Sequence, residues 1–259
     1  MGDRDFSEER QQKIIEFVNA ENRVNVDDLS RLFNVTQATV RRDLLALENR
    51  GLVYRAHGGA VKREQNSIWQ MSSLQTRLRQ HEEEKKRIAL YISEIIHDGQ
   101  SIMIDGGSTT TEAARVLCGK KNLLIVTNSL TIGEMFVESG NNKIILTGGE
   151  LLKETYSLIG NATEHSLANY RCDAAIIGVS GIVPAEGCFS AIPQEAEVKN
   201  LMLRNSQKKI IITDSSKIGV HAFYQFCSME YINLLITDRN IQKNDLAVLK
   251  KAGLEVAVV

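Results

Sequence analysis

The chain has 259 residues, 43% of them hydrophobic, and a formal net charge of −1. This length favours two domains, one small and one large, and the near-neutral charge excludes any argument for nucleic-acid binding from total charge. The first residues are polar and no apolar run is long enough to span a bilayer, so we expect a cytoplasmic protein without membrane association. The four cysteines follow no metal-ligand spacing, so we expect free thiols, no metal and no cofactor.

Apolar residues recur at helical spacing in three segments near the N-terminus. The first helix is expected to begin with Ser7 as its N-cap. The second covers residues 25–33, and a two-residue break at 34–35 separates it from a third at 36–48. Thr36 can cap the third helix, because its hydroxyl can accept a hydrogen bond from a backbone N–H left free at the helix start. This arrangement predicts a helix-turn-helix.

The third helix is the candidate recognition helix. In a helix-turn-helix, the second of the two helices lies in the major groove and contacts bases mainly with its N-terminal residues. Its outward side includes groups that can reach base edges or phosphates. The residues of this side are Thr36, Gln37, Ala38, Thr39, Arg41 and Arg42. For this helix taken alone, an ordinary amphipathic surface helix with solvated arginines is an equal alternative.

The stretch after the third helix predicts a wing. Gly51 can end the helix, residues 52–55 can form a strand, and Gly58 with Gly59 can turn a hairpin. The basic residues along this hairpin suit the phosphate backbone of DNA, and they are Arg55, His57, Lys62 and Arg63. From residue 36 to residue 63 the chain has six Lys or Arg residues and two acidic ones, so the basic excess is local.

We assign residues 1–62 to an α+β winged helix-turn-helix that binds DNA. Two sequence motifs within this domain resemble those of a known family. Thr36-x-x-Thr-Val-Arg-Arg-Asp-Leu-x-x-Leu-Glu-x-x-Gly51, followed by Arg55-Ala-His-Gly-Gly-Ala60, resembles the DeoR family of bacterial transcriptional regulators. The resemblance extends through the C-terminal region to the end of the chain. It implies a winged helix-turn-helix joined to a C-terminal sensor domain.

Residues 63–80 are rich in Gln, Asn and Ser and predict a linker between the two domains. A helix is expected at residues 82–96, with acidic residues at its start where the helix dipole favours them. In the resembled family a lysine in this run is a regular feature, here Lys85 or Lys86. We expect both lysines on a solvated face of the helix.

From residue 100 onward, short apolar strands alternate with helices. Continuous apolar strands in such an alternation imply a mostly parallel sheet that is covered on both faces. The seven expected strands are residues 101–104, 123–126, 143–146, 174–178, 209–213, 234–237 and 255–259. We therefore expect an α/β sensor domain over residues 81–259. Ligands of such sheets bind beyond the carboxyl ends of the strands, so the loops after the strands form the candidate site.

The loop from Asp105 to Thr110 is the first candidate within this site. Its sequence, Asp-Gly-Gly-Ser-Thr-Thr, follows a strand and opens a helix. Glycines let the backbone approach a ligand, and the helix N-terminus offers free N–H groups and a positive dipole to an anion. A compatible structural alternative is a capping box, with Thr109 as N-cap and Glu112 three residues later.

Other polar loops follow the remaining strands, and Lys217 in one of them is a charge partner for a phosphate. Each loop taken singly can also be a simple turn. The family resemblance implies a C-terminal domain that resembles ribose-5-phosphate isomerase in fold and binds phosphorylated sugars. By the same resemblance the phosphate would be held by Ser108, Thr109, Thr110 and Lys217. The sugar hydroxyls would be contacted by Asn128 and Glu195, and the effector site would also include Asp105 and Gly107.

Together these features predict a sequence-specific transcriptional regulator and not an enzyme. The resemblance implies a homodimer or homotetramer that represses a sugar-utilisation operon, binds an inverted repeat in double-stranded DNA and leaves it when a phosphorylated sugar binds. The alternative is a sugar-phosphate isomerase-like enzyme with an appended DNA-binding segment. The acid–base groups of such an enzyme would be Asp105, Glu195, Asp214 and Lys217.

Overall fold

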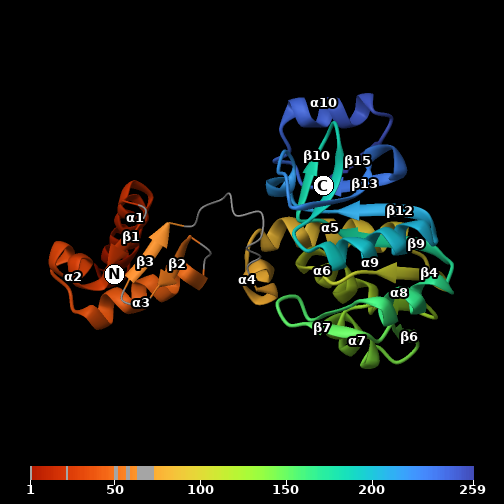
Figure 1. The fold of residues 1–259 in the computed structure, drawn as a ribbon, viewed down its shortest axis with the longest axis horizontal. Helices are drawn as coiled ribbons and strands as arrows, with labels where there is room; N and C mark the ends of the chain where they lie inside the picture. Colours follow the sequence, from red (N-terminus) through yellow and green to blue (C-terminus); the bar gives the residue numbers. More distant parts are fainter. Residues whose placement is uncertain (1, 22, 50–51, 57–58, 63–72) are drawn as a thin grey trace. The chain divides into compact units, whose positions relative to one another are not determined.

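The computed structural model describes residues 2–21, 23–49, 52–56, 59–62 and 73–259. The chain divides into two compact units, Met1–Ser67 and Ile68–Val259 (Figure 1). Each unit has a hydrophobic core of its own.

The first unit contains three helices and a three-stranded antiparallel sheet. Its elements are α1 (Gly2–Glu21), β1 (Arg23–Asn25), α2 (Val26–Phe33), α3 (Gln37–Asn49), β2 (Val53–Ala56) and β3 (Gly59–Lys62). The three predicted helices and the hairpin are confirmed, and β1 adds a third strand beside β3 that the sequence does not predict. The N-cap expected at Ser7 is wrong, because α1 begins at Gly2 and no proline or glycine interrupts it before Ser7.

Apolar residues from all three helices and from the sheet form the core of this unit. Ile14 of α1, Leu29 of α2 and Leu44 of α3 are each no more than 2% exposed. Gly59 is required at the start of β3, because a Cβ atom there would lie 1.9 Å from the carbonyl oxygen of Val24 in β1. A side chain at this position would therefore separate β1 from the sheet.

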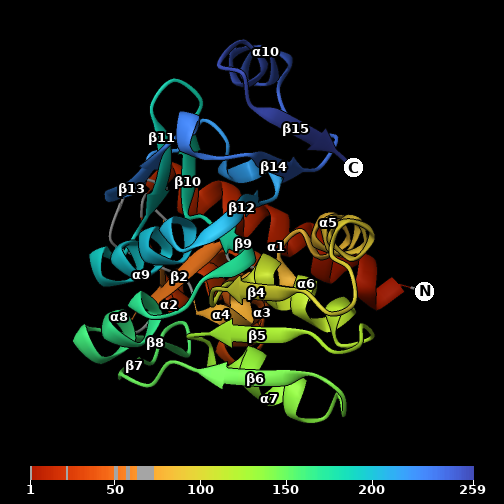
Figure 2. The same ribbon diagram turned by 90° about the vertical axis from the view of Figure 1, so that its right-hand side faces the viewer.

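A seven-stranded parallel sheet forms the centre of the second unit (Figure 2). In the order β15-β14-β12-β9-β4-β5-β6, its strands are β15 (Glu255–Val258), β14 (Leu234–Thr237), β12 (Ser206–Ile212), β9 (Cys172–Gly178), β4 (Ser101–Ile104), β5 (Leu124–Thr127) and β6 (Lys143–Leu146). All seven predicted strands are confirmed, because each overlaps one strand of this sheet. Every neighbouring pair is parallel, as the mostly parallel α/β prediction requires.

Helices cover both faces of this sheet. One face carries α5 (Glu82–Ile95), α6 (Ser108–Leu117) and α7 (Leu130–Val137), and the other carries α8 (Asn161–Ala168), α9 (Pro193–Arg204) and α10 (Lys243–Lys251). Successive side chains of a strand point to opposite faces. Ile102 and Ile104 of β4 therefore belong to the first core layer, and Met103 to the second.

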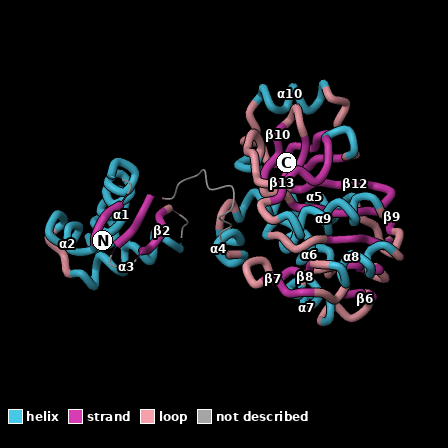
Figure 3. Tube along the Cα trace, viewed as in Figure 1, coloured by secondary structure: helices cyan, strands magenta, loops and turns pink. Residues whose placement is uncertain are grey.

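Shorter elements that the sequence does not predict complete the second unit (Figure 3). They include α4 (Leu74–Arg79), the hairpin of β7 (Glu150–Leu152) and β8 (Ser157–Ile159), and a small sheet of β10 (Gly181–Val183), β11 (Gly187–Ser190) and β13 (Tyr224–Ser228). Helix α4 lies inside the segment 63–80 that the sequence assigns to a linker, and its Leu74 is buried. Residues 74–79 are thus helical, and residues 63–72 lie outside the described residues.

The order of the strands reverses between β4 and β9. From β4 the chain continues outward through β5 and β6, whereas from β9 it continues in the opposite direction through β12, β14 and β15. The loops after β4 and β9 therefore diverge to opposite faces and leave a crevice between them. In open α/β sheets ligands bind at this switch point.

Candidate functional site

The N-terminal end of α3 is exposed in the way a recognition helix requires. Thr36 is the N-cap, and its Oγ1 accepts a hydrogen bond of 3.2 Å from the backbone N–H of Thr39. Thr39 is half-buried. The other predicted base- and phosphate-contacting residues of this helix are exposed: Thr36, Gln37, Ala38, Arg41 and Arg42. None of these five residues is buried in the core, and Arg41 and Arg42 give this surface two guanidinium groups.

Buried charge pairing fixes α3 against α1. The carboxylate of Asp43 is 3% exposed and accepts hydrogen bonds from Arg10 Nε at 2.6 Å and from Gln11 Nε2 at 3.2 Å. One of the two acidic residues in the basic region is therefore neutralised inside the unit. The exposed face of α3 is consequently more positive than the sequence count indicates.

The wing residues are placed only in part. Arg55 lies in β2 and Lys62 in β3, whereas His57 and Arg63 lie outside the described residues. On α3, Gln37 donates to Asp27 Oδ1 of α2 and accepts from Arg41, at 2.5 and 3.3 Å. These polar side chains already hydrogen-bond to one another at the surface, so they can exchange these bonds for bonds to another polar surface.

The second unit contains a cavity, partly open to solvent, beyond the carboxyl ends of β4, β9 and β12, and its empty space together with the adjoining solvent is about 550 Å³. It therefore lies at the switch point between β4 and β9. Residues 106–109, 178–180 and 213–214 line it after the three strands, together with Arg77, Gln80, His81, Lys85, Glu195, Lys199 and Lys217. The structure thus brings together five of the eight predicted effector residues: Gly107, Ser108, Thr109, Glu195 and Lys217.

The N-terminus of α6 faces this cavity without a capping side chain. The N-cap residue is Gly107, so the capping box expected from Thr109 to Glu112 is wrong. The helix begins two residues earlier than that capping box requires. A glycine N-cap has no side chain that could accept hydrogen bonds from the free N–H groups of the first turn. Ser108 and Thr109 are in its first turn and line the cavity. An uncapped helix N-terminus in a cavity suits an anion.

Four basic side chains line the cavity, of which the sequence predicts only Lys217. Lys85 is 2% exposed, so its expected solvated position is wrong. Its ammonium donates to the carbonyl oxygens of Arg77 and Gln80 at the end of α4, while Lys86 forms exposed ion pairs. Burial lowers the pKa of Lys85 to about 8, although nearby Asp214 raises it.

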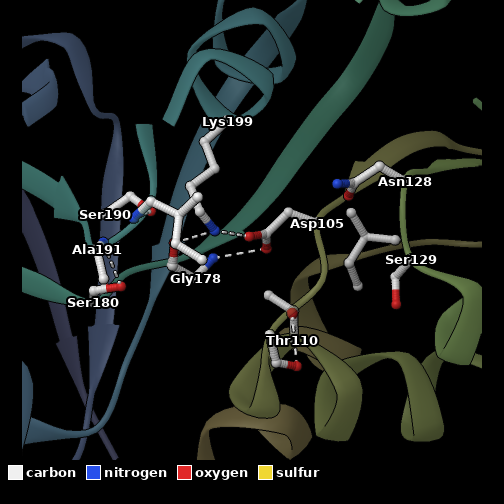
Figure 4. A network of polar contacts seen from close by, with 12 residues as sticks. Asp105, Thr110, Asn128, Ser129, Gly178, Ser180, Ser190, Ala191 and Lys199 are labelled. Carbon is white, nitrogen blue, oxygen red and sulfur yellow. Dashed lines mark hydrogen bonds and ion pairs between the residues drawn. The ribbon is translucent and has the colours of Figure 1, made fainter. Parts of the chain in front are cut away.

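Asp105 acts inside the fold and is not among the lining residues. Its Oδ2 forms a buried ion pair with Lys199, and its Oδ1 accepts a hydrogen bond of 2.9 Å from the backbone N–H of Gly178 (Figure 4). Lys199 also donates to the carbonyl oxygen of Gly178 at 3.2 Å. Asp105 therefore joins β4, β9 and α9 below the cavity, and its predicted effector contact is replaced by a positioning role.

Two further predicted effector residues are used by the protein itself. Thr110 is fully buried, and its hydroxyl donates to the carbonyl oxygen of Gly107 at 3.1 Å. The side-chain amide of Asn128 donates to the carbonyl oxygen of Leu158 at 3.0 Å, which connects the end of β5 to β8. Neither residue lines the cavity. Thr110 lies in the first turn of α6 and Asn128 in the loop after β5, and the side chain of each hydrogen-bonds to the protein itself.

Glu195 is the acidic residue of α9 that lines the cavity. It is 4% exposed, and its Oε1 atom is buried without a hydrogen-bond partner. Burial raises the pKa of this carboxyl group, whereas Lys199, the nearby hydroxyl of Thr155 and Arg77 lower it. Lys199 follows Glu195 by one helical turn on the same helix, and this spacing was the sequence signal that could have identified Lys199.

Comparisons with known proteins agree with this arrangement. Residues 80–239 match the family model of the DeoR C terminal sensor domain, and residues 10–66 match that of the DeoR-like helix-turn-helix domain. The chain is 32% identical over 253 residues to the HTH-type transcriptional repressor GlcR of Bacillus subtilis (strain 168), covering 98% of this chain and 96% of that protein. It is 33% identical over 233 residues to the glycerol-3-phosphate regulon repressor of Escherichia coli (strain K12), covering 89% and 90%.

Among solved structures, ribose 5-phosphate isomerase A from Neisseria gonorrhoeae matches 52% of this chain and 52% of its own, with a TM-score of 0.38 and 20% identity. A likeness this distant supports no argument about function. A helix-turn-helix unit and a sensor unit in one chain define a class of transcriptional regulators. This chain belongs to the DeoR family. Among the described residues, no helix could cross a membrane and no cluster of side chains could hold a metal.

Proposed function

We propose that this chain is a sequence-specific DNA-binding repressor of a sugar-utilisation operon, and that a phosphorylated sugar releases it from its operator. The proposal is carried by one observation: a cavity at the switch point of the sheet is lined by four Lys or Arg side chains against two carboxylates. Because Lys199 already pairs with Asp105, one positive charge remains in excess, which the negative charge of a phosphate group would balance. The helix-turn-helix in the same chain is the part whose DNA binding such a ligand would regulate.

The DNA contacts are assigned to the exposed end of α3 and to the wing. Gln37, Thr39 and Arg41 would contact base edges, and Arg42, Arg55 and Lys62 would contact phosphates. Two copies of the chain related by two-fold symmetry would place their recognition helices in successive major grooves, about 34 Å apart. A homodimer or homotetramer bound to an inverted repeat meets this requirement.

The effector contacts are assigned to the cavity. The N–H groups at the start of α6 and the hydroxyls of Ser108 and Thr109 would hold the phosphate with Lys217 and Lys85. The name of the glycerol-3-phosphate regulon repressor supports a small phosphorylated ligand for a related protein. The effector would therefore be a phosphorylated sugar or polyol.

Helix α4 is the element through which binding would be transmitted. Its residue Arg77 and the following Gln80 line the cavity, and Lys85 holds the carbonyl oxygens of both. Residues 63–72, which connect the two units, directly precede this part of the chain. Tenfold weaker DNA binding requires that the effector prefer the released state by about 1.4 kcal/mol.

The enzyme alternative has less support. Two of its four acid–base groups already serve the fold: Asp105 pairs with Lys199, and Asp214 accepts hydrogen bonds from the backbone and hydroxyl of Ser216. A general base needs a carboxylate free to take a proton from substrate. Turnover of pentose or hexose phosphates by the purified protein would restore this alternative.

Selection of sheared genomic DNA fragments by the purified full chain tests the proposal. At near-physiological salt we expect a few sites with inverted repeats to be enriched, and the variant R41A/R42A to lose them. Recovery of a random sample of the genome by the wild type would contradict sequence-specific binding. Release of the selected fragments is then measured with a panel of sugar phosphates.

A further inference from the structure

An exposed series of hydrogen bonds connects the two helices of the helix-turn-helix. Asp27 lies in the first turn of α2, and its Oδ1 accepts a hydrogen bond of 2.5 Å from the side-chain amide of Gln37, the first residue of α3. The oxygen of the same amide accepts a hydrogen bond of 3.3 Å from Arg41, one turn further along α3. All three side chains are exposed, so these bonds lie beside the surface to which DNA is assigned.

These two bonds decide which way round the amide of Gln37 lies. A carboxylate only accepts hydrogen bonds, so Asp27 holds the nitrogen of the amide, and a guanidinium only donates them, so Arg41 holds the oxygen. Turning the amide by 180° would place its oxygen against the carboxylate and its nitrogen against the guanidinium. Both bonds would then be lost, so Gln37 is held in one of its two orientations.

The held amide keeps the two groups that recognise adenine. A side-chain amide has two N–H groups and two oxygen lone pairs. Among the described residues, Asp27 takes one N–H and Arg41 takes one lone pair, which leaves one of each. In the major groove a glutamine recognises adenine by donating to N7 and accepting from N6. Gln37 can therefore bind adenine without giving up either of its present bonds.

We propose that Asp27 positions Gln37 to select an adenine in each half-site of the operator. The inference rests on the proposed function, because it assumes that α3 lies in the major groove. An amide that nothing orients can donate a single hydrogen bond to an acceptor of any base pair, so it discriminates poorly. A carboxylate beside the recognition helix also repels DNA phosphates. Asp27 thus contributes to specificity at the expense of general affinity.

A purely structural role for Asp27 is the alternative explanation. The dipole of α2 favours negative charge in its first turn, and Asp27 shares that turn with Asp28. Asp28 is also exposed, but it pairs with Arg31 at 3.0 Å and not with Gln37. The two acids therefore have the same relation to the helix dipole, and only Asp27 is connected to α3. This difference makes Asp28 the matched control.

Base discrimination by the full chain tests the inference. Fluorescence anisotropy measures its affinity for the selected operator and for operators in which each base pair of a half-site is replaced by the other three. We expect the wild type to prefer adenine at least about fivefold at one position, and Q37A to lose the preference at that position alone. D27A should reduce the same preference to within about twofold and leave the other positions unchanged.

Further variants separate positioning from charge and from folding. D27N keeps an oxygen that can accept the bond from Gln37, so it should keep the preference for adenine. D28A should keep it too. The double variant D27A/Q37A should discriminate as Q37A does, because Asp27 acts through Gln37. D27A should bind random-sequence DNA at least as tightly as the wild type, because a carboxylate that repels phosphates is gone.

Four results would overturn the inference and leave the proposed function intact. They are an unchanged preference in D27A, an equal loss of preference in D28A or D27N, a preference for another base at the position that Q37A affects, and weaker binding of random-sequence DNA by D27A. The proposed function fails separately. If the wild type binds the operator and random-sequence DNA equally at near-physiological salt, both proposals are overturned together.

Discussion

The buried ion pair between Asp105 and Lys199 gives the sharpest test of how the site is held together. The two side chains are 2% and 7% exposed, so solvent screens their charges little. The change Asp105→Asn keeps an acceptor for the N–H of Gly178 but leaves the ammonium of Lys199 without its carboxylate. Breaking such a buried pair costs about 3–5 kcal/mol.

This loss is large for a domain whose total stability is about 5–15 kcal/mol. For a unit of this size it corresponds to a fall in melting temperature of roughly 6–20 °C. Urea unfolding followed by circular dichroism measures the loss of stability. K86M is the control, because the ion pairs of Lys86 are exposed and solvent screens their charges.

The double variant D105N/K199M adds a second test of the same reasoning. Removing the ammonium as well should recover part of the loss, because no buried charge then lacks a partner. The role of the ion pair is refuted if D105N is no less stable than K86M. It is also refuted if D105N/K199M loses as much free energy of unfolding as the single variants D105N and K199M lose together.

Three further predictions follow from single positions. Gly59→Ala should destabilise the first unit by about 1–3 kcal/mol, seen as a lower melting temperature with loss of DNA binding, because the added Cβ would overlap the carbonyl oxygen of Val24. The affinity for sulfate should fall as the pH rises through about 8, because the Lys85 ammonium, whose pKa is about 8, loses its charge there; K85M should show no such fall, and K86M should behave as the wild type. Arg42→Ala should reduce the slope of log affinity against log salt concentration by about one, because Arg42 is expected to contact a phosphate. An unchanged slope in fluorescence anisotropy titrations would show that Arg42 makes no phosphate contact.

The regular elements were predictable from the sequence because their signals are local. The strands of the central sheet are buried on both faces and appear as continuous apolar runs, such as residues 101–104. The short strands β10, β11 and β13 were missed because each has three to five residues and the first two flank a three-residue turn that begins with Pro184. Helix α4 was missed because its six residues contain one buried apolar side chain, Leu74.

The site was predictable in position but only partly in its residues. The predicted loops after β4 and β12 both line the cavity, because the carboxyl ends of parallel strands meet at one edge of the sheet. The role of Lys85 depends on the carbonyl oxygens of α4, and the role of Asp105 depends on Lys199, which is 94 positions away in the chain. Tertiary contacts of this kind leave no periodic signal in the sequence, so a buried lysine and a solvated one look alike.

The measurement that tests the central claim most directly is the affinity of the full chain for its selected operator, with and without phosphorylated sugars. We expect one compound to weaken binding at least about tenfold. We expect the variant K217M to bind the operator as the wild type does without that compound, and to need a much higher concentration of it for release. Operator binding that no phosphorylated sugar changes, or a K217M variant released as easily as the wild type, would contradict the proposal that this cavity controls DNA binding.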